Sequence, residues 1–107
     1  MSKSASEYFA AMPAHFQPDR AANLRATYQF DLSGEGGGKW FVQIRDGALE
    51  VGQGEKPAPD VTIRASAKDY IAIAEGRMSP VLALATRKFK IGGSMGLAMK
   101  LQTVFTR

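Results

Sequence analysis

Regular alternation of apolar and polar residues over 24–32 is the feature that most restricts how this chain folds. Side chains of an extended chain point to opposite faces in turn, so this spacing predicts a strand with one buried and one solvated face. A glycine-rich segment, 33–38, follows and allows the chain to reverse. The predicted buried face consists of Leu24, Ala26, Tyr28, Phe30 and Leu32.

More strands are predicted after the glycine-rich turn. A second alternating segment is 40–44, and a third strand is predicted through Leu49 and Val51. Between them, Asp46-Gly47 favours a type I′ hairpin turn, because both central positions of that turn need positive φ. Two further strands are predicted at 61–65 and 88–91.

Helical spacing and helix start signals occupy much of the remaining chain. Ser66 precedes an apolar helical pattern, with Asp69 three positions later as in a capping box. Ser79-Pro80 is typical of a helix start, and Pro13 is expected to end or kink the first helix. The predicted helices are 3–12, a short turn from Pro18, 66–76, 79–85 and a last one from Ser94 to about Thr106.

The order of these elements indicates an α+β fold in a single domain, residues 1–107. Consecutive hairpins favour a five-stranded, mainly antiparallel sheet. Because the strands have a polar face as well as an apolar one, about five helices are expected to pack on one face only.

Composition narrows the classes of function. The chain has no cysteine, which excludes disulfides, thiolate catalysis and cysteine-ligated metals. No stretch resembles a secretion signal or approaches the roughly 20 apolar residues of a membrane span, so a cytoplasmic protein is expected. The net charge of +4 is uneven, because residues 77–107 include six Lys or Arg and no acid. This excess indicates an anionic neighbour such as nucleic acid, lipid head groups or a phosphate-bearing ligand.

Two motifs suggest chemistry that the rest of the chain does not support. Residues 92–96 match G-x-S-x-G, but that nucleophile needs an acid and a histidine later in the chain, and none follows Ser94. Ser94 is therefore expected to cap the last helix. Residues 34–39 suggest a phosphate loop, yet such a loop leads into a helix and this one leads into a predicted strand. His15 is the one histidine and has no partner at metal-ligand spacing, so no metal, cofactor or catalytic residue is expected.

The basic stretch Arg87, Lys88 and Lys90 has several interpretations. Lys88 and Lys90 project to one side of the predicted strand, where they form either a solvated sheet face or a surface for an anionic membrane or ligand. Nucleic-acid binding is not expected, because no exposed aromatic residues are interleaved with the cations.

The last helix has two apolar sides. Leu97, Leu101 and Val104 cluster on one arc, which is enough for packing on a sheet. Met95 and Met99 fall near the opposite side, and methionine suits surfaces that accept varied apolar shapes. A cavity, a bound lipid, a dimer partner or another helix could each cover them.

These segments together resemble the sterol carrier protein family, lipid-transfer domains that are also found fused to peroxisomal enzymes. The resemblance covers nearly the whole chain. It is carried by an ordered series: 26–32 with its glycine turn, 40–47, 59–63, then Asp69, Ile73 and Gly76, and finally 88–93, 97–101 and Phe105.

The resemblance implies an apolar tunnel between sheet and helices that binds fatty acids, fatty acyl-coenzyme A, sterols or phospholipids without chemistry. Competing hypotheses are a protein-interaction or dimerisation module and an accessory domain of a lipid-metabolising enzyme. We expect Arg87, Lys88, Lys90 and Lys100 to contact an anionic head group or membrane. The expected tunnel-lining residues are Phe16, Trp40, Tyr70, Ile73, Leu82, Leu84, Met95, Met99, Leu101 and Phe105.

Overall fold

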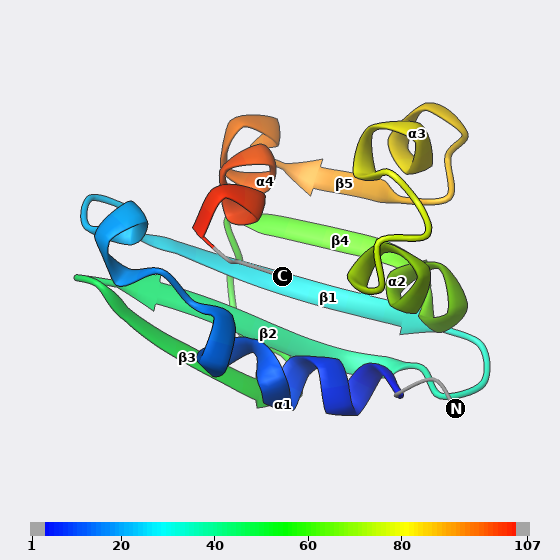
Figure 1. Ribbon diagram of the computed structural model, residues 1–107, viewed down its shortest axis with the longest axis horizontal. Coiled ribbons are helices and arrows are strands. Elements are labelled where there is room, and N and C mark those ends of the chain that lie inside the picture. The colour runs from blue at the N-terminus through cyan, green and yellow to red at the C-terminus, as the bar shows by residue number, and fades with distance from the viewer. Residues whose placement is uncertain (1–3, 105–107) are drawn as a thin grey trace.

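A five-stranded sheet forms the centre of the protein, whose computed structural model describes residues 4–104 (Figure 1). The strands lie in the order β3-β2-β1-β4-β5, so the first strand of the chain is the central one. Their bounds are β1 Ala26–Ser33, β2 Gly38–Arg45, β3 Ala48–Gln53, β4 Val61–Ser66 and β5 Lys90–Gly93.

Three of the four strand pairings are antiparallel, which confirms the mainly antiparallel prediction. The exception is β1 with β4, which run parallel. A parallel neighbour requires a crossover, because a tight turn can only reverse the chain. Residues 54–60 make that crossover from the β3 edge to β4.

The predicted β2–β3 turn is present at Asp46-Gly47, whose φ values are 52° and 77°. Both central residues therefore have the positive φ that a type I′ turn needs. Two strands begin a few residues later than the sequence predicted. Leu24 lies before β1 although it is buried, and β5 begins at Lys90 rather than Lys88.

The described residues contain four α-helices and two short 3₁₀ turns, rather than about five helices. The predicted last helix is divided: α4 ends at Leu101 and a 3₁₀ turn follows, while residues 105–107 lie outside the described part. The first helix continues past Pro13 to His15, so its predicted end at residue 12 came too early, and its predicted start at residue 3 lies outside the described residues. The bounds are α1 Ala5–His15, η1 Pro18–Ala21, α2 Ala67–Ala74, α3 Pro80–Ala85, α4 Met95–Leu101 and η2 Gln102–Val104.

Serine caps fix where these helices begin. The Ser66 hydroxyl accepts a hydrogen bond from the Asp69 amide at 3.0 Å, and the Ser94 hydroxyl accepts one from the Leu97 amide at 3.1 Å. The capping role predicted for Ser94 is thus confirmed. A full capping box that the sequence analysis overlooked joins Ser4 and Glu7 at the start of α1.

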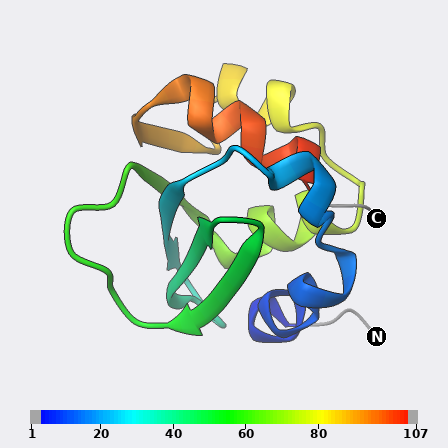
Figure 2. The ribbon, with the colours of Figure 1, turned by 90° about the vertical axis from the view of Figure 1, so that its left-hand side faces the viewer.

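The helices pack on one face of the sheet, and the 54–60 crossover passes over the other (Figure 2). The alternating residues of β1 and β2 point to the helical face as predicted, with Tyr28, Val42 and Ile44 completely buried. Because those side chains face the helices, the hydrophobic core and any space within it lie between the sheet and the helices.

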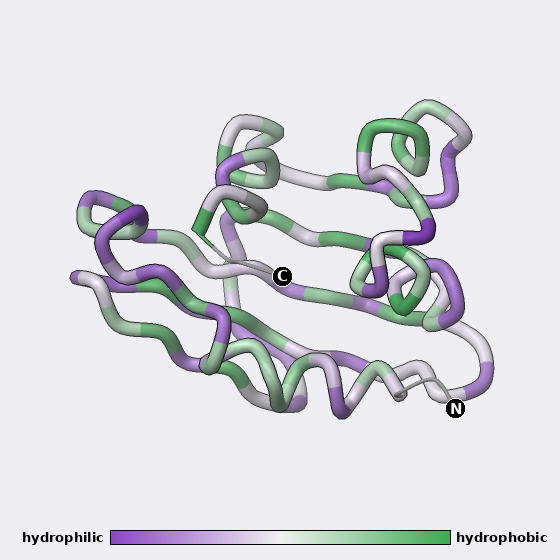
Figure 3. The backbone as a smooth tube through the Cα atoms, in the orientation of Figure 1, coloured by the Kyte–Doolittle hydropathy of each residue, from purple (hydrophilic) through white to green (hydrophobic). Residues whose placement is uncertain are grey.

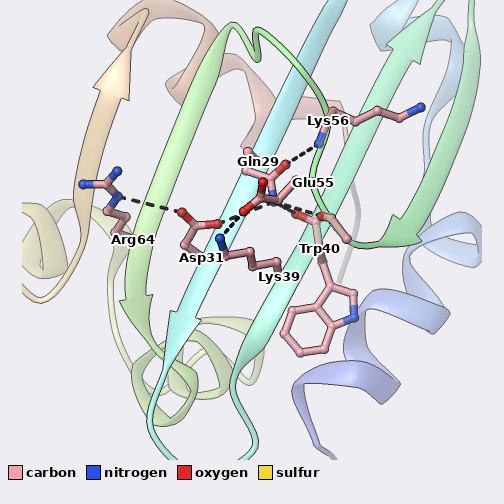
Figure 4. A network of polar contacts seen from close by, with 8 residues as sticks. Gln29, Asp31, Lys39, Trp40, Glu55, Lys56 and Arg64 are labelled. Atoms are coloured by element: carbon pink, nitrogen blue, oxygen red, sulfur yellow. Dashed lines mark hydrogen bonds and ion pairs between the residues drawn. The ribbon is translucent and has the colours of Figure 1, made fainter.

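Gln29 fastens the crossover to the outer face of the sheet, where its side chain is buried (Figure 4). Its Nε2 donates to the carbonyl oxygens of Trp40 at 3.1 Å and Gly54 at 3.0 Å. Its Oε1 accepts from the Lys56 amide at 2.9 Å. A single amide thus satisfies three backbone groups of the loop and the sheet.

Candidate functional site

An apolar cavity of about 470 Å³ lies between the helices and one half of the sheet. Its floor comes from Phe30 of β1, Ile63 of β4 and Ile91 of β5. Those three residues are directly opposite one another in the strand register, Phe30 with Ile63 and Ile63 with Ile91. The parallel β1–β4 pair is therefore what assembles a continuous apolar floor from three distant parts of the chain.

All four α-helices contribute to the walls. On α1, Tyr8, Met12 and His15 are spaced at i, i+4 and i+7, which brings them to one side of the helix. On α3, Pro80 and Leu84 share the side that faces the cavity. The remaining wall residues are Ala11 of α1, Tyr70, Ile73 and Ala74 of α2, Phe89 before β5, and Ala98, Met99 and Leu101 of α4.

An aromatic stack supports the wall at Tyr70. Phe9 lies between two rings, with its centroid 4.7 Å from that of Tyr70 and 5.0 Å from that of Trp40. The edge of the stack meets Phe30 of the floor, whose ring is 5.1 Å from Phe9 in a T-shaped contact. Wall and floor are thus locked together by aromatic packing.

The few polar side chains of the lining are phenols and one imidazole. The Tyr8 hydroxyl donates to Glu75 Oε2 at 2.7 Å, and this hydrogen bond is the main cause that raises the pKa of Tyr8. Glu75 also pairs with Arg77 at 2.6 Å, so one carboxylate connects α1 to the end of α2. Burial raises the pKa of Tyr70. Both phenols stay protonated near neutral pH, where they can donate hydrogen bonds but cannot act as bases.

The structure brings together half of the predicted lining residues. Tyr70, Ile73, Leu84, Met99 and Leu101 line the cavity.

The other predicted lining residues lie elsewhere. Phe16 is half-buried against the core, and Trp40 is buried behind Phe9. Leu82 and Met95 face solvent, with exposed fractions of 60% and 49%. Phe105 lies outside the described residues. Sequence reasoning grouped these side chains by apolar character, which does not decide the side of the element on which the cavity forms.

Several lining residues were missed by the sequence analysis. Tyr8 and Met12 are four residues apart in the sequence, which is helical spacing, but only the packing of α1 shows that they face a cavity. The floor residues Ile63 and Ile91 could not be related to Phe30 without the strand order.

The predicted cations divide between the two faces of the protein. Arg87, Lys88 and Lys90 border a shallow groove on the outer face, where Lys39 and Arg64 join them. Lys100 instead extends from α4, on the helical face. Arg87 and Lys88 connect α3 to the edge strand β5, so they lie where the two faces meet. The expectation that these four cations contact an anionic head group or membrane stays a prediction.

The strand register explains the outer groove. A row of charged residues crosses four neighbouring strands, with one residue from each: Lys39, Asp31, Arg64 and Lys90. This row is displaced by one residue from the row that forms the cavity floor, so its side chains point to the other face of the sheet. Figure 4 shows Lys39, Asp31 and Arg64 on this face, with the Trp40 ring directed to the opposite side. Lys39 pairs with Glu55, and Arg64 lies 3.9 Å from Asp31. The cations therefore outnumber the acids on this surface.

The suspected catalytic motifs have structural roles. Ser94 caps α4, and the 34–37 segment is the β1–β2 hairpin turn, after which Lys39 continues as part of β2. Within residues 4–104, no group of three or more His, Asp or Glu side chains could hold a metal ion. In that same part of the chain, no helix is long and apolar enough to cross a bilayer.

Solved structures of other proteins share this arrangement of sheet and helices. Palmitated SCP2L2 from Aedes aegypti superposes with a TM-score of 0.77 at 26% identity, covering 100% of this chain and 96% of that one. A sec-alkylsulfatase, Pisa1 from Pseudomonas sp., gives a TM-score of 0.86 at 16% identity, covering 98% of this chain and 17% of that one, and shares the fold alone.

Comparison with curated proteins shows relatives that are much longer. Hydroxysteroid dehydrogenase-like protein 2 of Xenopus tropicalis is 36% identical over 92% of this chain and 24% of its own length. The Bos taurus protein is 33% identical over 99% of this chain and 26% of its own length. The chain thus spans about a quarter of these relatives. The family model for SCP-2 sterol transfer matches residues 9–106, and the chain belongs to that family.

Proposed function

We propose that this domain binds one fatty-acyl chain, or a lipid of similar cross-section, in the cavity and releases it unchanged. The observation that carries the proposal is the cavity itself: about 470 Å³ of space whose lining is apolar apart from Tyr8, His15 and Tyr70. The palmitated relative with the same fold supports a fatty acid as the ligand class.

Burial of the alkyl chain supplies the binding free energy. Each methylene that leaves water contributes about 0.8 kcal/mol, so ten contribute roughly 8 kcal/mol. That corresponds to a dissociation constant of about 1 µM before ordering costs are subtracted. Because no fixed polar contact to the tail is needed, we expect chain length and shape to matter more than head-group identity.

The lining supports binding rather than catalysis. The described wall and floor contain neither a carboxylate nor a hydroxyl nucleophile of Ser or Thr, and their phenols are held protonated. General acid–base chemistry needs a group whose pKa lies near the working pH and a partner placed against the substrate. We therefore propose that the domain itself is not an enzyme.

Lipid binding is tested by native mass spectrometry of the purified protein and by titration with a fluorescent fatty acid. We expect a co-purifying fatty acid or saturable probe binding that unlabelled palmitate displaces. If the delipidated protein binds no probe and no lipid co-purifies, the proposal is wrong. A sedimentation experiment with and without lipid distinguishes the alternative of a dimerisation module, for which the mass would change while no ligand bound.

A second proposal concerns the setting in which the domain works. Its curated relatives are hydroxysteroid dehydrogenase-like proteins that extend far beyond the matched region. This observation favours an accessory role, in which the domain holds an apolar substrate or product for a lipid-metabolising enzyme. An enzyme that co-purifies with the protein at constant stoichiometry would support the role. Unchanged turnover of that enzyme when the domain is added or removed would contradict it.

A further inference from the structure

Helix α3 is apolar on every side and yet remains exposed. Its six residues, Pro80–Ala85, are Pro, Val, Leu, Ala, Leu and Ala. Val81 is 64% exposed and Leu82 is 60% exposed. A helix that is hydrophobic all round normally lies inside a protein or a membrane. We therefore expect an apolar surface or partner to cover this helix.

Each side of α3 has a distinct environment. Pro80 and Leu84 line the cavity, and Ala83 is completely buried against the rest of the protein. The residues left over, Val81, Leu82 and Ala85, are exposed on the side that faces away from both. The uncovered apolar face is thus separated from the cavity by the width of one short helix.

Cations flank this apolar face. Arg77 precedes α3, and Arg87 and Lys88 follow it after Thr86, so that Figure 3 shows the green of α3 between purple stretches. Arg77 is paired with Glu75, and no Asp or Glu follows Glu75 in the sequence. Short apolar segments with adjacent Lys or Arg are suited to the interface of a bilayer, where cations reach the head groups while apolar side chains enter the acyl region.

Helix α4 extends the same surface. Figures 1 and 2 both place α3 and α4 along the β5 edge of the protein. The large hydrophobic residues that are strongly exposed in the described chain all lie on these two helices, where Met95 and Met99 add to Val81 and Leu82. Lys100 follows Met99 directly. Apolar side chains and an excess of positive charge therefore meet along one edge, which also borders the cavity.

We propose that this α3–α4 edge docks on an anionic phospholipid bilayer, with Val81 and Leu82 inserted into the interface and Arg87, Lys88 and Lys100 at the head groups. The excess of positive charge favours a bilayer over another copy of this cationic chain. Where the proposed lipid-binding function also holds, a lipid passes between bilayer and cavity along Pro80 and Leu84. Docking itself does not depend on that function.

Co-sedimentation with vesicles tests the docking. The wild type is mixed with vesicles of phosphatidylcholine alone and with vesicles in which about a third of the lipid is phosphatidylglycerol. We expect binding only to the anionic vesicles. Val81→Glu should weaken it about tenfold or more, because one inserted side chain is lost and a repelled charge is added. Ala48→Glu, which adds the same charge on exposed β3 at the opposite edge, should bind as the wild type does.

The contribution of charge is measured separately. Arg87→Gln should weaken binding to anionic vesicles about fivefold, the effect of one cation near the bilayer surface. Arg45→Gln, which removes another exposed arginine at the end of β2, is the matched control and should bind like the wild type. Equal losses in the two variants would show a general charge effect and overturn the assignment to this edge.

Insertion is measured by tryptophan fluorescence. The native Trp40 is only 5% exposed and gives a constant background. The emission of Val81→Trp should shift to shorter wavelength when anionic vesicles are added, and that of Ala48→Trp should not. If the emission does not shift, α3 does not enter the bilayer and the proposal is wrong. The proposal is also wrong if the protein self-associates as its concentration rises and Val81→Glu abolishes this, because a second copy then covers α3. Probe binding without vesicles tests the lipid cavity independently, so failure of one proposal leaves the other measurable.

Discussion

The rings of Phe9 and Tyr70 stack with their centroids 4.7 Å apart and their planes only 2° from parallel. Phe9 belongs to α1 and is 1% exposed, whereas Tyr70 belongs to α2 and lines the cavity. The hydrophobic core therefore determines the position of one wall of the proposed lipid site. Stability and ligand binding are coupled through this pair.

Replacement of Phe9 should affect both properties. Phe9→Ala removes a buried ring that contacts Trp40, Tyr70 and Phe30, and we expect it to lower the free energy of unfolding by about 3–5 kcal/mol. It should also weaken fatty-acid probe binding, because Tyr70 loses its support. Urea unfolding and probe titration measure the two effects. Phe41→Ala is the control: Phe41 is buried on the outer face, so its loss should lower stability and leave probe affinity of the folded protein unchanged.

Two methionines of one helix offer a matched test of the cavity. Met99 lines it and Met95, one turn earlier, does not. Met99→Glu should weaken probe binding about tenfold or more, since a carboxylate next to the alkyl chain must be desolvated. Met95→Glu introduces the same charge and should leave probe affinity in solution nearly unchanged. Equal affinities for both variants would assign Met99 to structure alone.

Alkaline pH should destabilise the protein through its tyrosines. All three phenols have pKa values above the ordinary 10.0: burial raises the pKa of Tyr28 to about 12, burial raises that of Tyr70, and the bond to Glu75 raises that of Tyr8. The folded state therefore favours protonated phenols. Their contribution to stability is complete below pH 10 and is lost as the pH rises from 10 through about 12.

Ultraviolet absorbance of tyrosinate measures this directly. Near pH 10 the folded protein should show little tyrosinate, and ionisation should rise together with unfolding followed by circular dichroism. The same titration in concentrated denaturant is the control and should give the ordinary pKa. Half-ionisation near pH 10 in a protein that is still folded would contradict the prediction.

The crossover should depend on a single amide. Gln29→Glu keeps the shape of the side chain but removes the Nε2 donor, which bonds to the Trp40 and Gly54 carbonyls and, at 3.5 Å, to Asp31 Oδ1. We expect a loss of about 1–3 kcal/mol in stability and faster amide exchange in residues 54–60. Gln43→Glu is the matched control, because Gln43 makes one side-chain bond, to Thr27, on the same face. Similar exchange rates in the two variants would remove Gln29 from this role.

The strands and their buried faces could be predicted because alternation is a local property. Tyr28, Val42 and Ile44 take every second position, and each is completely buried. Turn and cap residues were equally informative, as Asp46-Gly47 and Ser94 show. These signals depend on the backbone conformation of a few neighbouring residues. That conformation is determined largely by the types of those residues, so it can be predicted from the sequence.

The cavity floor could not be predicted because it is a product of strand order. Phe30, Ile63 and Ile91 meet only because β4 lies parallel to β1, and no residue near any of them indicates that pairing. For the same reason Arg64 was not grouped with Lys90, although they are direct neighbours across two strands. The family resemblance implied a tunnel, but the side chains that bound it follow from the register.

The parallel β1–β4 pair also has a consequence for the order of folding. Strands β1, β2 and β3 are joined by tight turns, so they can form a meander from contacts that are close along the chain. Strand β4 must first close a longer loop before it reaches β1. During refolding we therefore expect the meander to acquire amide protection early, and the capacity to retain a lipid to emerge last.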